Sequence, residues 1–478
     1  MVVNLGSGSK LIFKTKPWAH QLKALEYMYP RDAAALYTKP GSGKTKIMID
    51  LVVNRGFKRV LVVAPKKPCD VWKPQVQIHS NIPPDHVYEL HNMTGKEKAA
   101  LLKTFKPVKP GEGCTIFICN YDSIWQKPVD KVWFYKKLGI DCVICDESHR
   151  IKSPSSKCSC FLARLGKVVP HRYLLTGTPL AENPLDVYAQ YRFLDRSIYG
   201  TNYAAFCDKY LNIDLNLSAR VGFPIKDKKQ PYKNLDDLRE KMFSCAFYMK
   251  STIELPKTTR MVIKIPMPAG LEYLYKELDK EGALEMDEGY MTVNNALSMV
   301  IRKQQVTSGY LPLEHDDGTT ELKRISTYRR TYLYQFLKGL PESEPVVIFA
   351  KFSKDLYAIR KVAERLSCGY SEVSGKEDSL KSWKSGKTRI LGVQYTAGSE
   401  SIDLTRAHLC IFYTLDHSLG KYDQARARVH RPGQEKPCIY YHFVATMSSG
   451  KTVDQEILQC WKDKKNYIDF VMENFQNS

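Results

Sequence analysis

The sequence predicts an α/β fold with two lobes, each built on a parallel sheet, and a helical insertion between them. Short apolar runs alternate with helical patterns between residues 31 and 195, and the alternation returns between residues 345 and 445. Near-continuously apolar runs separated by helices are typical of parallel sheets covered on both faces. The length, 478 residues, also exceeds that of one ordinary domain of about 100 to 200 residues.

The apolar runs locate the expected strands. Those of the first lobe are AAALY, RVLVVAP, CTIFICN, DCVICDE and HRYLLTG, and those of the second are EPVVIFA, TRILGVQ, AHLCIFY and PCIYYHF. Residues 196–344 instead show long helical patterns, as in LEYLYKELDKEGALEM and ELKRISTYRRTYLYQFLKGL. Residues 451–475 predict a closing helix with an apolar stripe at Val453, Ile457, Trp461 and Ile468. We therefore expect three parts: residues 1–195, 196–344 and 345–478.

The chain is strongly basic. Lysine and arginine number 72 against 51 aspartate and glutamate residues, a formal net charge of +21. Such an excess suits a polyanionic partner, because binding releases counterions from phosphates; a soluble basic protein without such a partner is the alternative. The stretch KDKKQPYKN at 226–234 fits a solvated loop as well as a nucleic-acid contact.

Neither a membrane segment nor a secretory signal is predicted. No apolar run approaches the roughly 18 residues of a membrane span, and the start MVVNLGSGSK lacks the parts of a signal peptide. We expect the chain to stay in its compartment of synthesis. Thirteen scattered cysteines argue for reduced thiols. Cys142 and Cys145, followed by Cys158 and Cys160, could suggest zinc, but residues three apart on a strand face opposite sides, which favours core cysteines.

A phosphate-binding loop is predicted at TKPGSGKT, residues 38–45, which follows the strand AAALY and precedes the helix KIMIDLVVN. Glycines at 41 and 43 let backbone N–H groups converge on phosphate oxygens at the positive end of the helix, while Lys44 reaches the outer phosphates and Thr45 binds magnesium. Thr38 replaces the usual first glycine. The expected phosphate contacts are Pro40, Gly41, Ser42, Gly43, Lys44 and Thr45. The similar GSGSK at 6–10 follows no strand and is expected to be a flexible tail.

Two carboxylates follow the strand DCVIC. In a P-loop enzyme, an acidic residue at such a strand end holds magnesium, and a neighbouring carboxylate can orient and deprotonate the attacking water. We assign Asp146 to magnesium and Glu147 to the water. Adjacent carboxylates at a strand end can also be a solvated turn, but the P-loop upstream in the same lobe favours the functional interpretation.

The order of these motifs resembles that of superfamily 2 helicase-like motors. GSGKT, DESH, LLTGTP at 174–179 and QARARVHRPGQ at 424–434 occur in the family's order, and the last resembles the sixth motif of Swi/Snf-type DNA translocases. Weaker matches are WAHQLKALEYM, VVAPKKPCDVW, ICNYDS, RIKSPSSK, IELPKT, IRKQQVTSG and VVIFAKFSKDL. The resemblance covers most of the chain.

The resemblance implies two RecA-like lobes that close on one ATP, with DNA across both. It implies that Gln21 reads adenine and that Arg428 and Arg431 act as arginine fingers, stabilising the charge of the transferred phosphoryl group; an exposed basic helix face is the alternative for RARVHR. The coupling residues that it implies are Thr176, Gly177, Thr178 and Gln424. The candidate DNA contacts are Lys66, Lys67, Asn120, Lys152 and Thr396.

One segment departs from the family's pattern. In GVQYTAGSESIDL, Ser399 and Ser401 stand where glycines are expected, and Gln394 and Tyr395 replace a small hydroxyl pair. Serine restricts the backbone where it approaches DNA phosphate, so this departure concerns the coupling of DNA binding to hydrolysis and not hydrolysis itself.

The predicted function is a magnesium-dependent, DNA-stimulated ATPase that translocates on double-stranded or branched DNA. Strand separation or annealing is the nearest alternative activity, and a DNA-binding protein built on a degenerate NTPase scaffold is a second. A small-molecule P-loop kinase would not explain the second lobe. We expect a monomeric motor, with a protein partner left open, associated with DNA in the cytoplasm of a bacterial cell or a virus-infected host.

Overall fold

The computed structural model covers the full chain. It describes residues 2–4, 10–104, 113–126, 132–215, 218, 226–227, 229–249, 254–286, 289–292, 296–315, 319–395 and 402–473. The chain divides into two compact units. Unit 1 comprises Met1–Ile253 and Asn466–Ser478, and unit 2 comprises Glu254–Lys465. The middle region expected at 196–344 is therefore shared, with 196–253 in unit 1 and 254–344 in unit 2.

Unit 1 is built on a seven-stranded sheet in which every strand pair is parallel. Its order is β5-β6-β4-β7-β8-β3-β9. The strands are β3 (Ala33–Thr38), β4 (Arg59–Ala64), β5 (Val87–Glu89), β6 (Thr115–Asn120), β7 (Cys142–Asp146), β8 (His171–Thr176) and β9 (Ala246–Met249). The five strands expected in this lobe are confirmed, and the sequence reasoning missed the two edge strands β5 and β9.

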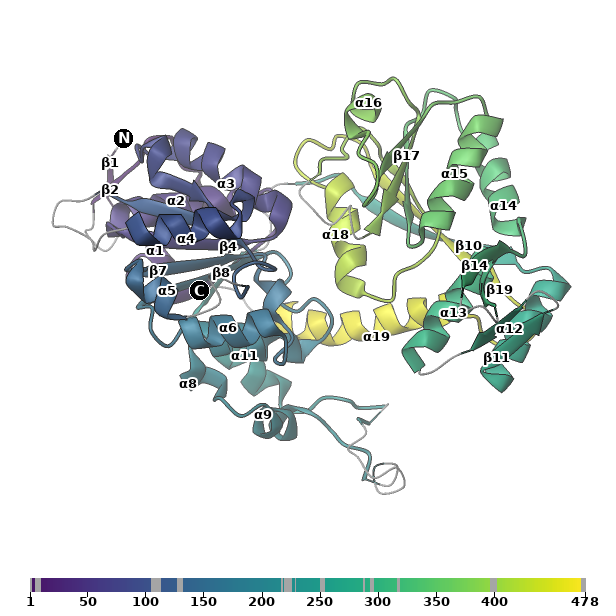
Figure 1. The fold of residues 1–478 in the computed structure, drawn as a ribbon, viewed down its shortest axis with the longest axis horizontal. Helices are drawn as coiled ribbons and strands as arrows, with labels where there is room; N and C mark the ends of the chain where they lie inside the picture. Colours follow the sequence, from purple (N-terminus) through teal and green to yellow (C-terminus); the bar gives the residue numbers. More distant parts are fainter. Residues whose placement is uncertain are drawn as a thin grey trace. The chain divides into compact units, whose positions relative to one another are not determined.

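Two apolar cores cover the two faces of this sheet, because alternate strand residues point to opposite sides. On β7, Cys142 and Ile144 belong to one core, whereas Val143 and Cys145 belong to the other. The opposite orientation of Cys142 and Cys145 is thus confirmed, and both side chains are buried. Helices α1, α2 and α3 pack on the first face, and α5, α6, α7 and α11 on the second. Figure 1 shows helices on both sides of the sheet.

The helices of unit 1 connect successive strands. They are α1 (Ala19–Met28), α2 (Lys44–Arg55), α3 (Lys66–His79), α4 (Gly95–Thr104), α5 (Val132–Lys137), α6 (Lys157–Leu165), α7 (Val187–Leu194), α8 (Arg196–Tyr199), α9 (Tyr203–Tyr210) and α11 (Leu235–Phe243). Ahead of them, β1 (Val2–Asn4) and β2 (Lys10–Ile12) form an antiparallel pair.

Unit 2 is built on a second parallel sheet, with six strands in the order β10-β19-β18-β15-β17-β16. The strands are β10 (Thr258–Pro266), β15 (Val346–Ala350), β16 (Tyr370–Val373), β17 (Ile390–Gln394), β18 (Leu409–Phe412) and β19 (Cys438–Thr446). The four strands expected from the sequence are confirmed. Its helices are α12 (Ala269–Glu281), α13 (Ala296–Ser308), α14 (Tyr328–Lys338), α15 (Ser353–Arg365), α16 (Leu380–Lys384), α18 (Leu419–Val429) and the first part of α19 (Val453–Glu473).

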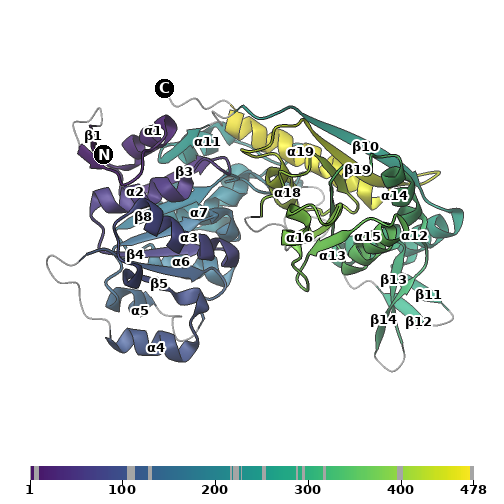
Figure 2. The same ribbon diagram turned by 90° about the horizontal axis from the view of Figure 1, so that it is seen from above.

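The middle region, which was expected to be a helical insertion, is not wholly helical. It contributes β10 to the large sheet and also holds a small antiparallel sheet, visible in Figure 2, of β11 (Ala283–Met286), β12 (Gly289–Thr292), β13 (Tyr310–Glu314) and β14 (Thr320–Arg324). Both predicted helical segments were too long. Gly282, at φ +70°, ends α12 before β11, and the pattern ELKRISTYRRTYLYQFLKGL begins inside β14. Left-handed backbone of this kind favours glycine and stops a helix.

The closing helix α19 is confirmed and contributes to both units. Val453, Ile457 and Trp461 are buried side chains of unit 2. In unit 1, Tyr467 packs edge-on against Tyr232 at 5.0 Å between ring centroids, and Val471 belongs to a core. Among the described residues, no helix has the length and apolar character needed to cross a membrane.

Candidate functional site

The loop predicted to bind phosphate joins the carboxyl end of β3 to the first turn of α2. Gly41 and Gly43 both have positive φ, +84° and +80°, which a side chain would strain. Gly43 is the N-cap residue of α2, so Lys44 and Thr45 begin the helix. The backbone N–H groups of a helix's first turn have no partner within the helix and point to its positive end. The sequence-predicted loop therefore has the geometry of an anion cradle.

Gln21 lies against this loop. Its side chain is 2% exposed, and its Nε2 donates to the Ser42 carbonyl at 3.2 Å while its Oε1 accepts from the Trp18 N–H at 2.9 Å. A Cβ on Gly43 would lie 2.3 Å from Gln21 Nε2. His20 Nε2 lies 2.9 Å from the same Ser42 carbonyl, a contact that the sequence reasoning missed. Placement beside the loop agrees with an adenine-reading role for Gln21, which stays a prediction.

Lys44 is 9% exposed, and its ammonium group lies inside the loop. Its Nζ donates to the carbonyl of Thr38 at 3.0 Å and lies 3.5 Å from that of Lys39. The Thr38 hydroxyl is in turn 2.7 Å from that of Ser42. Thr38, which stands where a glycine is usual, thus contacts Ser42 through its hydroxyl and Lys44 through its carbonyl.

Asp146 ends β7 and is 8% exposed. Burial, followed by the neighbouring charge of Glu147, raises the pKa of Asp146 to about 6, while Lys44 acts in the opposite direction. Oδ2 accepts from the Trp72 indole at 3.0 Å, and Oδ1 accepts from the Glu147 N–H at 3.0 Å. Trp72, on α3, carries no recognisable sequence signal for this role, because the contact joins residues 74 apart.

The carboxylate therefore fits a divalent cation. Each oxygen of Asp146 accepts one hydrogen bond, which leaves lone pairs, and carboxylate and hydroxyl oxygens are the ligands that Mg²⁺ prefers. A cation would offset the cost of ionising a buried group. Thr45, half-buried in the first turn of α2, supplies the candidate hydroxyl.

Glu147 and His149 form the second part of the site. Glu147 has left-handed backbone, with φ +52°, just before the short 3₁₀ turn Ser148–Ile151. His149 Nδ1 lies 3.4 Å from Glu147 Oε2 and 3.0 Å from the Thr176 hydroxyl. Burial lowers the pKa of His149, with Glu147 opposing, so the imidazole is neutral at pH 7.

The predicted coupling residues Thr176, Gly177 and Thr178 lie at the end of β8 beside these groups. Thr176 Oγ1 accepts from the Thr178 N–H at 3.0 Å. A Cβ on Gly177 would lie 2.9 Å from Pro40 Cδ and 3.3 Å from the Thr38 carbonyl, so this segment packs on the phosphate loop. The structure thus brings loop, carboxylates and coupling segment together in unit 1.

The predicted arginine fingers and the remaining predicted coupling residue lie in unit 2. Gln424 and Arg428 are on α18, and Arg431 follows the helix. The Arg428 carbonyl accepts from the Leu404 N–H at 3.0 Å, and Arg431 Nη1 is 3.4 Å from the Ile402 carbonyl. Burial opposes ionisation of Asp403, but hydrogen bonds from Thr405 and the charge of Arg431 lower its pKa overall.

Gln434 anchors the arginine-bearing turn. Its Nε2 lies within 3.2 Å of the carbonyls of Thr405, Ala407 and Val429. Gln434 ends the motif QARARVHRPGQ, and no role was predicted for it from the sequence.

Of the predicted DNA contacts, Lys66 and Lys67 open α3 after β4, and Asn120 ends the adjacent strand β6. The carboxyl ends of parallel neighbours meet at one sheet edge. Lys152 Nζ lies 3.4 Å from Glu182 Oε1 and 4.0 Å from Asp186 Oδ2, so it is paired within the protein. Thr396 lies outside the described residues, as do Ser399 and Ser401. DNA contact by these side chains stays a prediction.

Comparison with known families gives two matches. Residues 20–309 match the model of the SNF2-related domain, and residues 329–433 match that of the helicase conserved C-terminal domain. One similar solved structure, the Sulfolobus solfataricus SWI2/SNF2 ATPase core in complex with dsDNA, is 17% identical and covers 97% of this chain and 94% of its own, with a TM-score of 0.40.

The curated relatives have low sequence identity to this chain, but each match extends over most of it. Putative protein p41 of Acyrthosiphon pisum secondary endosymbiont phage 1 is 21% identical, with 96% of this chain and 98% of that protein covered. DNA repair and recombination protein RDH54 of Saccharomyces cerevisiae is 22% identical over 84% of this chain and 45% of its own length. A Drosophila melanogaster SWI/SNF-related matrix-associated actin-dependent regulator of chromatin subfamily A-like protein 1 is 24% identical over 76% of this chain.

The chain spans nearly all of the phage protein but slightly less than half of the yeast and fly proteins. The first family model alone covers more than half of the 478 residues, and its boundaries contain the phosphate loop, the carboxylates and the coupling segment. This chain therefore belongs to the SNF2-related family of helicase-like ATPases.

Proposed function

We propose that this protein is a magnesium-dependent, DNA-stimulated ATPase that translocates on double-stranded DNA. The observation that carries the proposal is the arrangement in unit 1 of Lys44 in the phosphate loop, buried Asp146 at the end of β7, and Glu147 held by left-handed backbone beside a neutral histidine. A scaffold that only binds DNA needs none of these features.

Each residue has a distinct task in hydrolysis. The Lys44 ammonium group exchanges its hydrogen bonds with loop carbonyls for hydrogen bonds with phosphate oxygens when ATP binds. Glu147 orients and deprotonates the attacking water, a proton transfer that accelerates the reaction about 10²-fold to 10⁴-fold. His149, neutral and hydrogen-bonded to Thr176, limits the positions of the Glu147 carboxylate. Asp146 and Thr45 would hold Mg²⁺, which would supply charge neutralisation on the phosphates. Arg428 and Arg431, from the second lobe, stabilise charge that develops as the phosphoryl group transfers.

Double-stranded DNA is the proposed track. The net charge of +21 favours a polyanion, and two relatives are named for DNA repair and recombination or for chromatin regulation. Backbone phosphates should dominate the contacts, so affinity should fall steeply with salt and depend little on base sequence. The near full-length likeness to a phage protein supports a bacterial cell or a virus-infected host as the setting of this proposed role.

The test compares ATP hydrolysis with and without duplex DNA, using Lys44→Ala as the control for contaminating ATPases. Stimulation by duplex that is lost in Lys44→Ala supports the proposal. Hydrolysis independent of DNA would favour a small-molecule enzyme, and no hydrolysis at all would favour the scaffold.

Translocation and unwinding are then separated on two substrates. We expect ATP-dependent displacement of the third strand from a triplex, with little separation of a plain tailed duplex. Efficient unwinding without triplex displacement would replace translocation by helicase activity and leave the ATPase assignment intact. Annealing of complementary strands is measured with the same protein preparation.

A further inference from the structure

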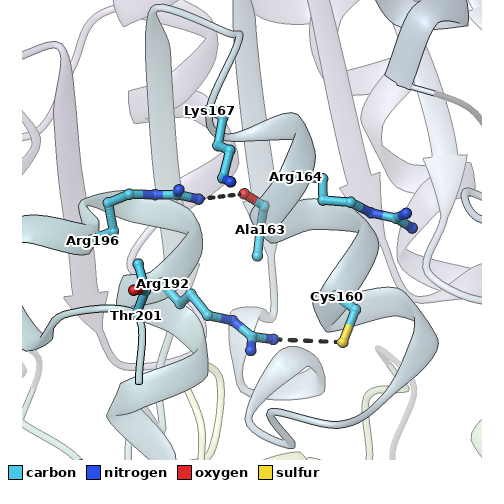
Figure 3. A pocket seen from close by; sticks show the side chains of 7 residues that line it. All are labelled: Cys160, Ala163, Arg164, Lys167, Arg192, Arg196 and Thr201. Carbon is cyan, nitrogen blue, oxygen red and sulfur yellow. Dashed lines mark hydrogen bonds between the residues drawn. The ribbon is translucent and has the colours of Figure 1, made fainter. Parts of the chain in front are cut away.

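A strongly cationic pocket lies in unit 1 among α6, α7, α8 and the turns that follow α6 and α8 (Figure 3). Its volume is about 420 Å³, and none of its lining residues belongs to the ATP site. Four of them are cationic and none is acidic. The cations are Arg164, Lys167, Arg192 and Arg196, and Cys160 and Thr201 lie beside them.

The packing of α6 on α7 shapes this pocket. Phe161 and Leu162 bury the apolar face of α6 in the core, which leaves Arg164 and Lys167 exposed. A Cβ on Gly166, between Arg164 and Lys167, would lie 2.5 Å from the Phe193 carbonyl of α7. The helices therefore approach closely at this point, and three of the four basic side chains come from helices, while Lys167 lies in the turn after α6.

The two inner arginines are held by neutral groups. Arg192 Nη2 donates to the Pro154 carbonyl at 2.6 Å and to the Ser159 hydroxyl at 3.2 Å, and Arg196 Nη2 donates to the Ala163 carbonyl at 2.9 Å. Arg192 Nε is buried and has no hydrogen-bond partner in the described part of the chain. Figure 3 shows both guanidinium groups reaching toward α6, with Lys167 nearby and Arg164 extending away.

Within the described ranges, none of the four cations of this pocket forms an ion pair with a carboxylate. Asp195, next to Arg196 in the chain, does not line the pocket; its Oδ1 accepts from the N–H and hydroxyl of Ser197 at 2.9 and 2.7 Å. Like charges gathered in one pocket repel each other, so an anion that enters is stabilised without having to displace a carboxylate.

We infer that this pocket binds phosphate groups and is a second anion site, separate from the ATP site. The planar donor forks of Arg192 and Arg196, together with the Lys167 ammonium group, match the oxygens of a phosphate monoester or diester. The ligand is either a phosphodiester of the DNA backbone or a free polyphosphate. If the ligand is DNA, the inference rests on the proposed function. The pocket would then add a DNA contact beyond those expected at the carboxyl edge of the sheet.

Cys160 provides a readout confined to the pocket. Its alkylation rate is followed by peptide mass spectrometry in the full chain, with exposed Cys460 of unit 2 as the internal reference. Pyrophosphate and a short duplex are the two probes. At about ten times its Kd, a ligand that fills the pocket lowers the rate about tenfold by mass action.

The variant Lys167→Gln/Arg196→Gln should abolish that protection, whereas Lys96→Gln/Lys103→Gln, the same charge change on exposed α4 lysines, should retain it. The single variant Lys167→Gln, at an exposed side chain, serves if the double variant fails to fold. With duplex, the pocket variant should also lower the salt slope of log affinity by about 0.9 for each phosphate no longer neutralised.

Protection by duplex alone identifies DNA as the ligand, and protection by pyrophosphate alone identifies a free polyphosphate. Protection by neither probe, or protection that survives Lys167→Gln/Arg196→Gln, would overturn the inference. The pyrophosphate arm does not depend on motor activity, so absence of DNA-stimulated hydrolysis in the parent protein would refute the proposed function without touching this result.

Discussion

Gly43 permits a direct test of how the phosphate loop is built. Replacing it by alanine imposes two separate costs. The first is backbone strain at φ +80°, and the second is the new Cβ, which would lie 2.3 Å from Gln21 Nε2. Gly56 at the other end of α2 is the matched control, because its φ is +67° and nothing lies within 4 Å of its added Cβ.

The two substitutions should therefore differ in magnitude. Left-handed backbone costs an alanine about 1 kcal/mol, and this is the whole effect expected of Gly56→Ala. In Gly43→Ala the Gln21 amide must also leave its contacts with Ser42 and Trp18, two hydrogen bonds worth about 1 kcal/mol each. The expected destabilisation of Gly43→Ala is about 3 kcal/mol.

Hydrogen exchange of the α2 amides measures this locally, which avoids treating a two-unit chain as a single unfolding transition. Exchange should accelerate about 5-fold in Gly56→Ala and about 150-fold in Gly43→Ala. In a double-mutant cycle, adding Gln21→Ala to Gly43→Ala should cost little more, since the amide is already displaced. Equal effects of Gly43→Ala and Gly56→Ala, or full additivity with Gln21→Ala, would refute the packing argument.

Three further outcomes are expected. Glu147→Gln should retain binding of ATP with magnesium while turnover, measured by phosphate release, falls about 10²-fold or more; parental turnover would contradict its role as the base. Arg428→Ala and Arg431→Ala should each lower the maximal DNA-stimulated rate about 10³-fold with ATP affinity nearly unchanged, and retained stimulation would remove the second lobe from the site. Burial lowers the pKa of His442 to about 4, so between pH 6.5 and 4 only the unfolded chain binds a proton at this residue. The free energy of unfolding should therefore decrease by up to about 3 kcal/mol as the pH is lowered through this range. In His442→Phe, hydrogen exchange of the β19 amides should lose this part of the pH dependence.

The sequence by itself determined most of the two sheets. Their strands are buried on both faces, so they stand out as apolar runs whatever their partners are, and nine predicted runs are strands in the structure. The strands missed in the two large sheets are the edge strands β5, β9, β10 and β16; β9 has only four residues, and β10 is exposed along most of its length. The predicted helices were too long where Gly282 ends α12 and where the second helical pattern overlaps β14. Local amphipathicity does not reveal which residues pair across a small sheet.

The site divides in the same way. The phosphate loop and the carboxylates were visible because glycine, lysine and acidic residues must follow a strand at fixed spacing, which is a local requirement. Only the tertiary structure decided that Trp72 bonds Asp146, that Gln21 lies under Gly43, and that His149 is neutral. The cationic pocket of α6, α7 and α8 likewise had no motif, since Arg164 and Lys167 are 25 to 32 positions from Arg192 and Arg196 and meet them only after the helices pack. Contacts between distant residues are set by packing of the whole core, and no local pattern records them.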